Sequence, residues 1–216
     1  MPAAKSRKQR GLTPVWPALN LPIAMRRSAV LSLLFAGLVA ACDNPFAILP
    51  ASITNRVDTV EVYAVNGTPL DKPSGYVMAS RLPLRLGIDL AAYNFDFLYR
   101  IDPTAGPQFV PYGALAPSTV NTTTSGRAGF IETSTPFDAI REGEQVGYNV
   151  DQPVNLSVGK TFYVRSGLPN GCFLGIPYYG KLEVISFDSA ARSVKFRILV
   201  DINCGYRGLE PGLPEK

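Results

Sequence analysis

The stretch that decides the fold is Lys181-Leu-Glu-Val-Ile-Ser-Phe-Asp-Ser-Ala-Ala-Arg-Ser-Val-Lys-Phe-Arg-Ile-Leu-Val-Asp-Ile202. Apolar and polar residues alternate on both sides of its Ser-Ala-Ala centre, which predicts two strands, 181–188 and 192–202, joined by a turn. If the strands fold back near Ala190, Lys181 lies opposite about Leu199. One face of the second strand is entirely apolar and is expected to enter a core: Val194, Phe196, Ile198, Val200 and Ile202.

Much of the preceding chain has the same period of two. The segment 57–65 is alternating and β-branched, and the turn dipeptide Asn66-Gly67 follows it. Two further stretches alternate in the same way: Leu82, Leu84, Leu86, Ile88 and Leu90, and then Phe95, Phe97, Tyr99 and Ile101. Pro83 cannot donate a ladder hydrogen bond, so its strand is expected at a sheet edge. Thr135-Pro136-Phe137-Asp138 resembles a helix start with threonine as the cap.

Short strands, many loops and almost no helix predict an all-β chain of seven to nine strands. We expect a single antiparallel β-sandwich, immunoglobulin-like or jelly-roll-like, with an open barrel as the alternative. A signal helix is expected before it.

The N-terminal segment Arg26–Cys42 differs from the rest of the chain. Arg26 and Arg27 precede an uncharged apolar run, and small residues lead to Cys42. A cationic start, a short apolar core and a small-residue exit are typical of a secretory signal peptide. The apolar run has about 14 residues, whereas a membrane-spanning helix needs about 20. The segment therefore predicts export rather than a permanent span.

The end of this segment, Leu38-Val39-Ala40-Ala41-Cys42, resembles the lipobox of bacterial lipoproteins. The resemblance implies cleavage after Ala41 and acylation of Cys42, which would anchor the chain to a lipid bilayer. It places the protein in the cell envelope, facing the periplasm or the exterior, with the choice between inner and outer membrane open. The alternative is an ordinary cleaved signal in which Cys42 has no role.

These patterns divide the chain into five segments. We expect residues 1–24 to be a disordered extension or a mis-assigned start, because Met25 directly precedes the twin arginines. The expected segments after it are a signal peptide (25–41), a tether (42–54), the β-sandwich (55–205) and a C-terminal tail (206–216).

The two remaining cysteines, Cys172 and Cys204, form an even pair once Cys42 carries lipid. In an exported protein an even pair predicts a disulfide. In the expected hairpin, both fall at the open end, as a bridge requires.

Composition excludes several classes of function. The six basic residues before Cys42 account for the apparent basic charge, because 15 basic and 17 acidic residues remain after it. Nucleic-acid binding is therefore not expected. The absence of histidine excludes serine-histidine triads and histidine-ligated metal sites. We expect no cofactor, no metal and no enzymatic activity. The alternative is a carboxylate hydrolase using Asp138, Glu142 and Glu144.

The segment Gly171–Gly180 is apolar and aromatic, and the predicted disulfide would hold it. It could be an exposed tip for a partner, or it could close the end of the sandwich. The candidate interaction residues are Phe173, Leu174, Ile176, Tyr178 and Tyr179, together with Tyr206 and Arg207. The sequence predicts a non-enzymatic interaction or structural module, with an envelope protein or a glycan as possible partner. The alternative is a lipoprotein that binds a small molecule or glycan in a cleft.

Overall fold

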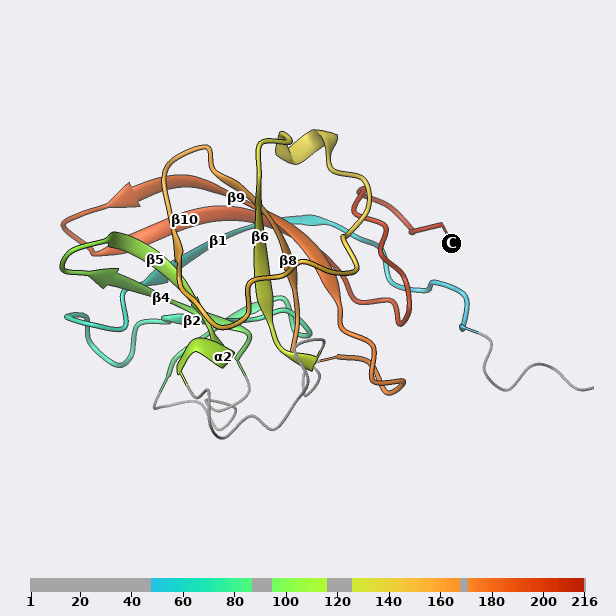
Figure 1. Ribbon diagram of the computed structural model, residues 1–216, viewed down its shortest axis with the longest axis horizontal. Helices are drawn as coiled ribbons and strands as arrows, with labels where there is room; N and C mark the ends of the chain where they lie inside the picture. Colours follow the sequence, from blue (N-terminus) through green and yellow to red (C-terminus); the bar gives the residue numbers. More distant parts are fainter. Residues whose placement is uncertain (1–47, 87–94, 116–125, 168–170, 216) are drawn as a thin grey trace, which may run out of the picture. The chain divides into compact units, whose positions relative to one another are not determined.

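The computed structural model describes residues 48–86, 95–115, 126–167 and 171–215. Two antiparallel five-stranded sheets pack together as an all-β sandwich (Figure 1). The predicted sandwich is therefore confirmed, and the open-barrel alternative is wrong. Among the described residues, the helical elements are one turn, α2 (Tyr112–Leu115), and one 3-10 turn, η2 (Phe137–Ala139). Neither is long and apolar enough to cross a bilayer.

The first sheet has the strand order β1-β10-β9-β8-β6. Its strands are β1 (Val57–Tyr63), β6 (Gly129–Thr133), β8 (Thr161–Arg165), β9 (Tyr179–Asp188) and β10 (Ser193–Asp201). The hairpin β9–β10 lies at its centre, and Lys181 faces Leu199 as predicted. An irregularity between Lys195 and Phe196 shifts the register near the turn.

The second sheet has the strand order β3-β2-β4-β5-β7. Its strands are β2 (Gly75–Val77), β3 (Leu82–Leu84), β4 (Phe97–Asp102), β5 (Gly106–Pro111) and β7 (Val154–Asn155). Strand β3 is an edge strand, as Pro83 predicted. The sequence predicted that Leu82 and Leu84 share one apolar face in the core. Leu84 is buried, but Leu82 is 59% exposed, so the prediction is wrong for Leu82. Residues 87–94, which include Ile88 and Leu90, lie outside the described residues.

The main core lies between the two sheets and is rich in aromatic rings. Phe97 is at its centre, with ring centroids 5.0 to 6.2 Å from those of Tyr76, Phe109, Phe130 and Phe196. All five side chains are buried. The apolar face predicted for the second hairpin strand enters this core, with Val194, Phe196, Ile198 and Val200 buried and Ile202 partly buried. The alternating pattern of β10 therefore identifies the face of this strand that packs in the core between the sheets.

A second apolar cluster covers the outer face of the first sheet. Leu199 and Tyr179 from the hairpin pack there against Phe137 and Ile140, which follow β6. The predicted helical turn is present as η2, but Pro136 occupies the cap position and no side chain caps it. Thr135 is therefore not the cap that the sequence predicted. The C-terminal half of β10, from Ile198 to Asp201, is buried on both faces, so this part of the hairpin lies between the two clusters.

The compact unit that contains the sandwich includes residues before 55 and after 205. Asn55 forms a bridge with Gly212, and Leu209 is fully buried in the second cluster. Gly208 also pairs with Glu142. The segment expected to be a tail after residue 205 therefore packs on the sandwich. Residues 48–54, expected to be tether, also contact it, whereas residues 42–47 lie outside the described residues.

Candidate functional site: the disulfide end of the sandwich

The predicted disulfide is present between Cys172 and Cys204, with a Cα–Cα distance of 5.4 Å. Tyr179 pairs with Asp201 at the open end of the β9–β10 hairpin, and the two cysteines lie just beyond this pair. The disulfide thus connects the loop before β9 to the segment after β10. It fixes the geometry of one end of the sandwich.

The loop from Gly171 to Tyr178 folds back on itself. The N–H of Cys172 donates to the carbonyl of Ile176, and the N–H of Gly175 donates to the carbonyl of Cys172, both at 2.9 Å. Gly175 has a φ of 70°, a left-handed conformation that favours glycine. At the base of the loop, the N–H of Tyr178 donates to Ser166 Oγ at 2.9 Å. The loop is therefore held by hydrogen bonds as well as by the disulfide.

The two interpretations of this loop each fit a different part of it. Tyr179 is buried, and Ile176 and Tyr178 are half-buried at the base. At the tip, the side chains of Phe173 and Leu174 are 78% and 44% exposed. The base closes the end of the sandwich, and the tip presents two apolar side chains to the surroundings.

Tyr206 and Arg207, which follow the disulfide, do not join this apolar tip. Tyr206 is buried, and its hydroxyl accepts a hydrogen bond from the N–H of Ala51 at 3.0 Å. Arg207 donates from Nη1 to the carbonyl of Gly143 at 2.8 Å, and its Nη2 pairs with Glu142. Both side chains hold surrounding segments together.

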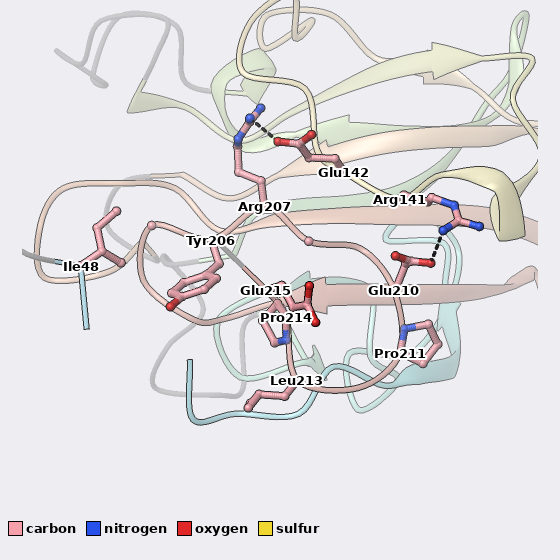
Figure 2. A pocket seen from close by; sticks show the side chains of 12 residues that line it. Ile48, Arg141, Glu142, Tyr206, Arg207, Glu210, Pro211, Leu213, Pro214 and Glu215 are labelled. Carbon is pink, nitrogen blue, oxygen red and sulfur yellow. Dashed lines mark hydrogen bonds and ion pairs between the residues drawn. The ribbon is translucent and has the colours of Figure 1, made fainter. Parts of the chain in front are cut away.

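A pocket of about 750 Å³ lies beside these residues (Figure 2). Two arginines form its charged wall, each paired with a glutamate: Arg207 with Glu142, and Arg141 with Glu210 at 3.1 Å. The other lining residues are Ile48, Gly205, Tyr206, Gly208, Pro211, Leu213, Pro214 and Glu215. Charged, aromatic and apolar groups are thus available for a ligand in one concave region.

Asn203 binds the segment before β1 to this end of the sandwich. Its Oδ1 accepts the N–H groups of Ser52 and Ile53, both at 2.9 Å. Its Nδ2 donates to the carbonyl of Ile53 and to Asp201 Oδ1, both at 2.8 Å. A single buried amide therefore joins the segment before β1 to the segment after β10, about 150 residues apart in sequence. Sequence reasoning missed this residue, because an isolated asparagine after a strand carries no pattern.

Asp201 is buried beneath Asn203 and is fully inaccessible to solvent. Burial raises the pKa of its carboxyl above the usual value, although hydrogen bonds from Asn203 and Asn55 and the charge of Arg81 act in the opposite direction. By contrast, the backbone N–H groups of Ala105 and Thr104 lower the pKa of Asp102, the last residue of β4.

The Asp201→Asn variant is expected to gain stability relative to wild type as the pH rises from about 3 to 7. A carboxyl with a raised folded-state pKa stabilises the fold below the unfolded-state pKa of about 3.9 and loses that contribution as pH rises through its folded value. The amide of the variant cannot ionise. The free energy of unfolding of the variant should therefore rise relative to that of the wild type as the pH increases. Chemical denaturation at several pH values measures it. Asp102→Asn is the matched control and should shift in the opposite direction. A pH-independent difference for Asp201→Asn would contradict this account.

The carboxylates considered for hydrolysis do not form one isolated pair. Asp138 pairs with Arg197 Nη2 at 3.1 Å, and the Nε of the same arginine pairs with Glu183. Glu142 pairs with Arg207, and Glu144 is exposed. Asp138 and Glu142 therefore both take part in ion pairs with arginines. This arrangement favours a structural role for Asp138 and Glu142.

Cys42 lies outside the described residues, so its acylation stays a prediction. Within the described ranges, no three His, Cys, Asp or Glu side chains gather in a way that could hold a metal ion. Comparison with protein-family models, with curated proteins and with solved structures finds no match.

Proposed function

We propose that the chain is a lipid-anchored β-sandwich of the cell envelope that serves as a non-enzymatic interaction or structural module. The observation that carries this proposal is the assignment of the three cysteines. Cys172 and Cys204 are joined in the disulfide. The third, Cys42, stands at the end of a lipobox-like segment. A structural disulfide also fits export to an oxidising compartment.

The distance from the anchor to the folded domain is short. Ile48 is six residues after Cys42, so the intervening chain spans at most about 20 Å when fully extended. Multiple acyl chains on one cysteine would give stable attachment. The domain would then work close to the bilayer surface.

Two features of the disulfide end support an interaction role. Phe173 and Leu174 are exposed on a loop that is already ordered, which reduces the entropy lost on contact with another surface. The nearby acids Asp138 and Glu142 are held by arginines. These features fit a rigid contact surface better than a hydrolytic centre.

The pocket beside Tyr206 favours a second candidate, a lipoprotein that binds a small molecule or glycan. Its volume of about 750 Å³ falls within the range of ligand sites. Arg141 is the more exposed of the two arginines in its wall, with 76% of its side chain accessible against 29% for Arg207, and could pair with an anionic or polyhydroxylated ligand.

Two measurements separate the candidates. Cross-linking in intact cells is expected to place the wild-type chain in a defined adduct with an envelope protein, because a module acts by contact. The melting temperature of the purified protein is expected to stay constant across a panel of glycans and small metabolites. No specific adduct would contradict the module.

A ligand-dependent rise in melting temperature would favour the second candidate if Arg141→Ala removes it. Arg56→Ala is the matched control, since its side chain is 67% exposed and does not line the pocket. That rise should persist in the control.

A further inference from the structure

The exposed apolar side chains of the described residues differ in their surroundings. Several stand singly on loops, such as Leu70, Val146 and Val158, and need no special explanation. Phe173 is the largest and most exposed of them, and Leu174 follows it directly. The segment from Gly171 to Tyr179 contains no charged residue. This tip can therefore leave water without desolvating a charge.

The tip lies at the end of the sandwich where the described chain begins. Cys172 is bonded to Cys204, and the following residue, Gly205, is so close to Ile48 that a Cβ on it would lie 2.9 Å from the Ile48 side chain. In Figure 1 the cyan start of the chain and the orange loop before β9 both lie on the right. The tip of the β9–β10 hairpin lies on the left.

Other exposed apolar side chains occur at this end. Leu49 and Leu213 are 64% and 58% exposed, and Leu213 lines the same pocket as Ile48. The opposite end carries Leu70, which is 66% exposed in the loop after β1. That loop contacts the hairpin turn, since Arg192 Nη2 donates to the carbonyl of Asn66 at 3.0 Å. Phe173 at one end of the domain can therefore be compared with Leu70, an exposed apolar side chain at the other end.

The short chain between Cys42 and Ile48 indicates which surface the tip contacts. Five residues lie between Cys42 and Ile48, and acyl chains on Cys42 would fix that residue at the bilayer surface. With a reach of about 20 Å, the end of the sandwich that contains Ile48 is the end nearest the lipid. A protein partner would have to enter this narrow space, whereas the bilayer is already there.

We propose that Phe173 and Leu174 insert into the interfacial layer of the bilayer that holds the acylated Cys42, as a second contact that orients the domain. This inference rests on the proposed lipid anchor. The disulfide and the hydrogen bonds within the loop hold the tip in place before contact, so little order is lost on insertion. Tyr178, half-buried at the base, is of the residue type that favours the membrane–water interface.

Single tryptophans test the contact, because the sequence after Cys42 contains none and Trp16 lies before it. Phe173→Trp and Leu70→Trp are introduced into the full chain, purified with the native anchor and reconstituted into phosphatidylethanolamine–phosphatidylglycerol vesicles. Lipids brominated near the headgroup end of the acyl chain serve as quenchers. Phe173→Trp is expected to show blue-shifted emission and to lose most of its fluorescence, and Leu70→Trp is expected to remain unquenched.

The outcomes distinguish the tip contact from the anchor itself. If the vesicles carry the protein during flotation but Phe173→Trp is quenched no more than Leu70→Trp, the tip contact is wrong and the anchor stands. If the tryptophan of Phe173→Trp is shielded from water in native membranes but not in vesicles, the tip contacts a protein partner. That result would also overturn the proposed contact with lipid. If the protein does not float with vesicles, the proposed anchor itself fails.

Discussion

Replacing Cys172 and Cys204 together with serine is expected to lower the free energy of unfolding by about 3–4 kcal/mol. The two residues are 32 positions apart, so the disulfide closes a loop of intermediate length in the unfolded chain. Removing it increases the conformational entropy of that chain. Urea denaturation of the oxidised wild type and the double variant measures the difference.

The same substitution is expected to loosen the end of the sandwich that contains the tip. Reduced wild type is the matched control, and its denaturation curve should coincide with that of the double variant. The unfolded, unreduced protein should show no titratable thiol at these positions. Two free thiols, or equal stability of the oxidised protein and the variant, would contradict the disulfide.

The sandwich could be predicted because its central strands carry strong local patterns. In β10, every second residue enters the core between the sheets, and the turn after Asp188 is short. The position of the turn sets the register of an antiparallel hairpin. The pairing of Lys181 with Leu199 could therefore be predicted from their distances in sequence to the turn. The short strand β7, Val154–Asn155, was harder to define, because two residues are too few to show a period.

The ends of the domain could not be predicted, because isolated long-range contacts define them. Asn203 binds Ser52 and Ile53, and Asn55 pairs with Gly212, across at least 150 residues in each case. Single amide side chains and backbone groups make these contacts, and neither produces periodicity. The segments before β1 and after β10 therefore resembled a tether and a tail.

The sequence did not distinguish the two parts of the loop Gly171–Tyr178. Its aromatic composition marked it as unusual, but composition alone does not separate the buried base from the exposed tip. Tyr179, the first residue of β9, is buried because its side chain packs in the second apolar cluster, whereas Phe173 lies at the turn of the loop and is exposed. The pocket near Tyr206 was also beyond the sequence, because its walls come from segments that meet only in the fold.

The Cys42→Ser variant is expected to lose incorporation of labelled fatty acid completely, since serine has no thiol to acylate. The double variant Cys172→Ser/Cys204→Ser is the matched control, because it also removes cysteines yet leaves the proposed modification site intact. It should label as wild type does. Whole-cell lysates probed with an antibody show that each variant is present.

The measurement that tests the lipid anchor most directly is metabolic labelling with a fatty-acid analogue, combined with the intact mass of the wild-type protein extracted from membranes. We predict label in the wild type but none in Cys42→Ser, and a mass above that of residues 42–216 by the attached acyl groups. Label that persists in Cys42→Ser, or an unlabelled wild type, would contradict the anchor.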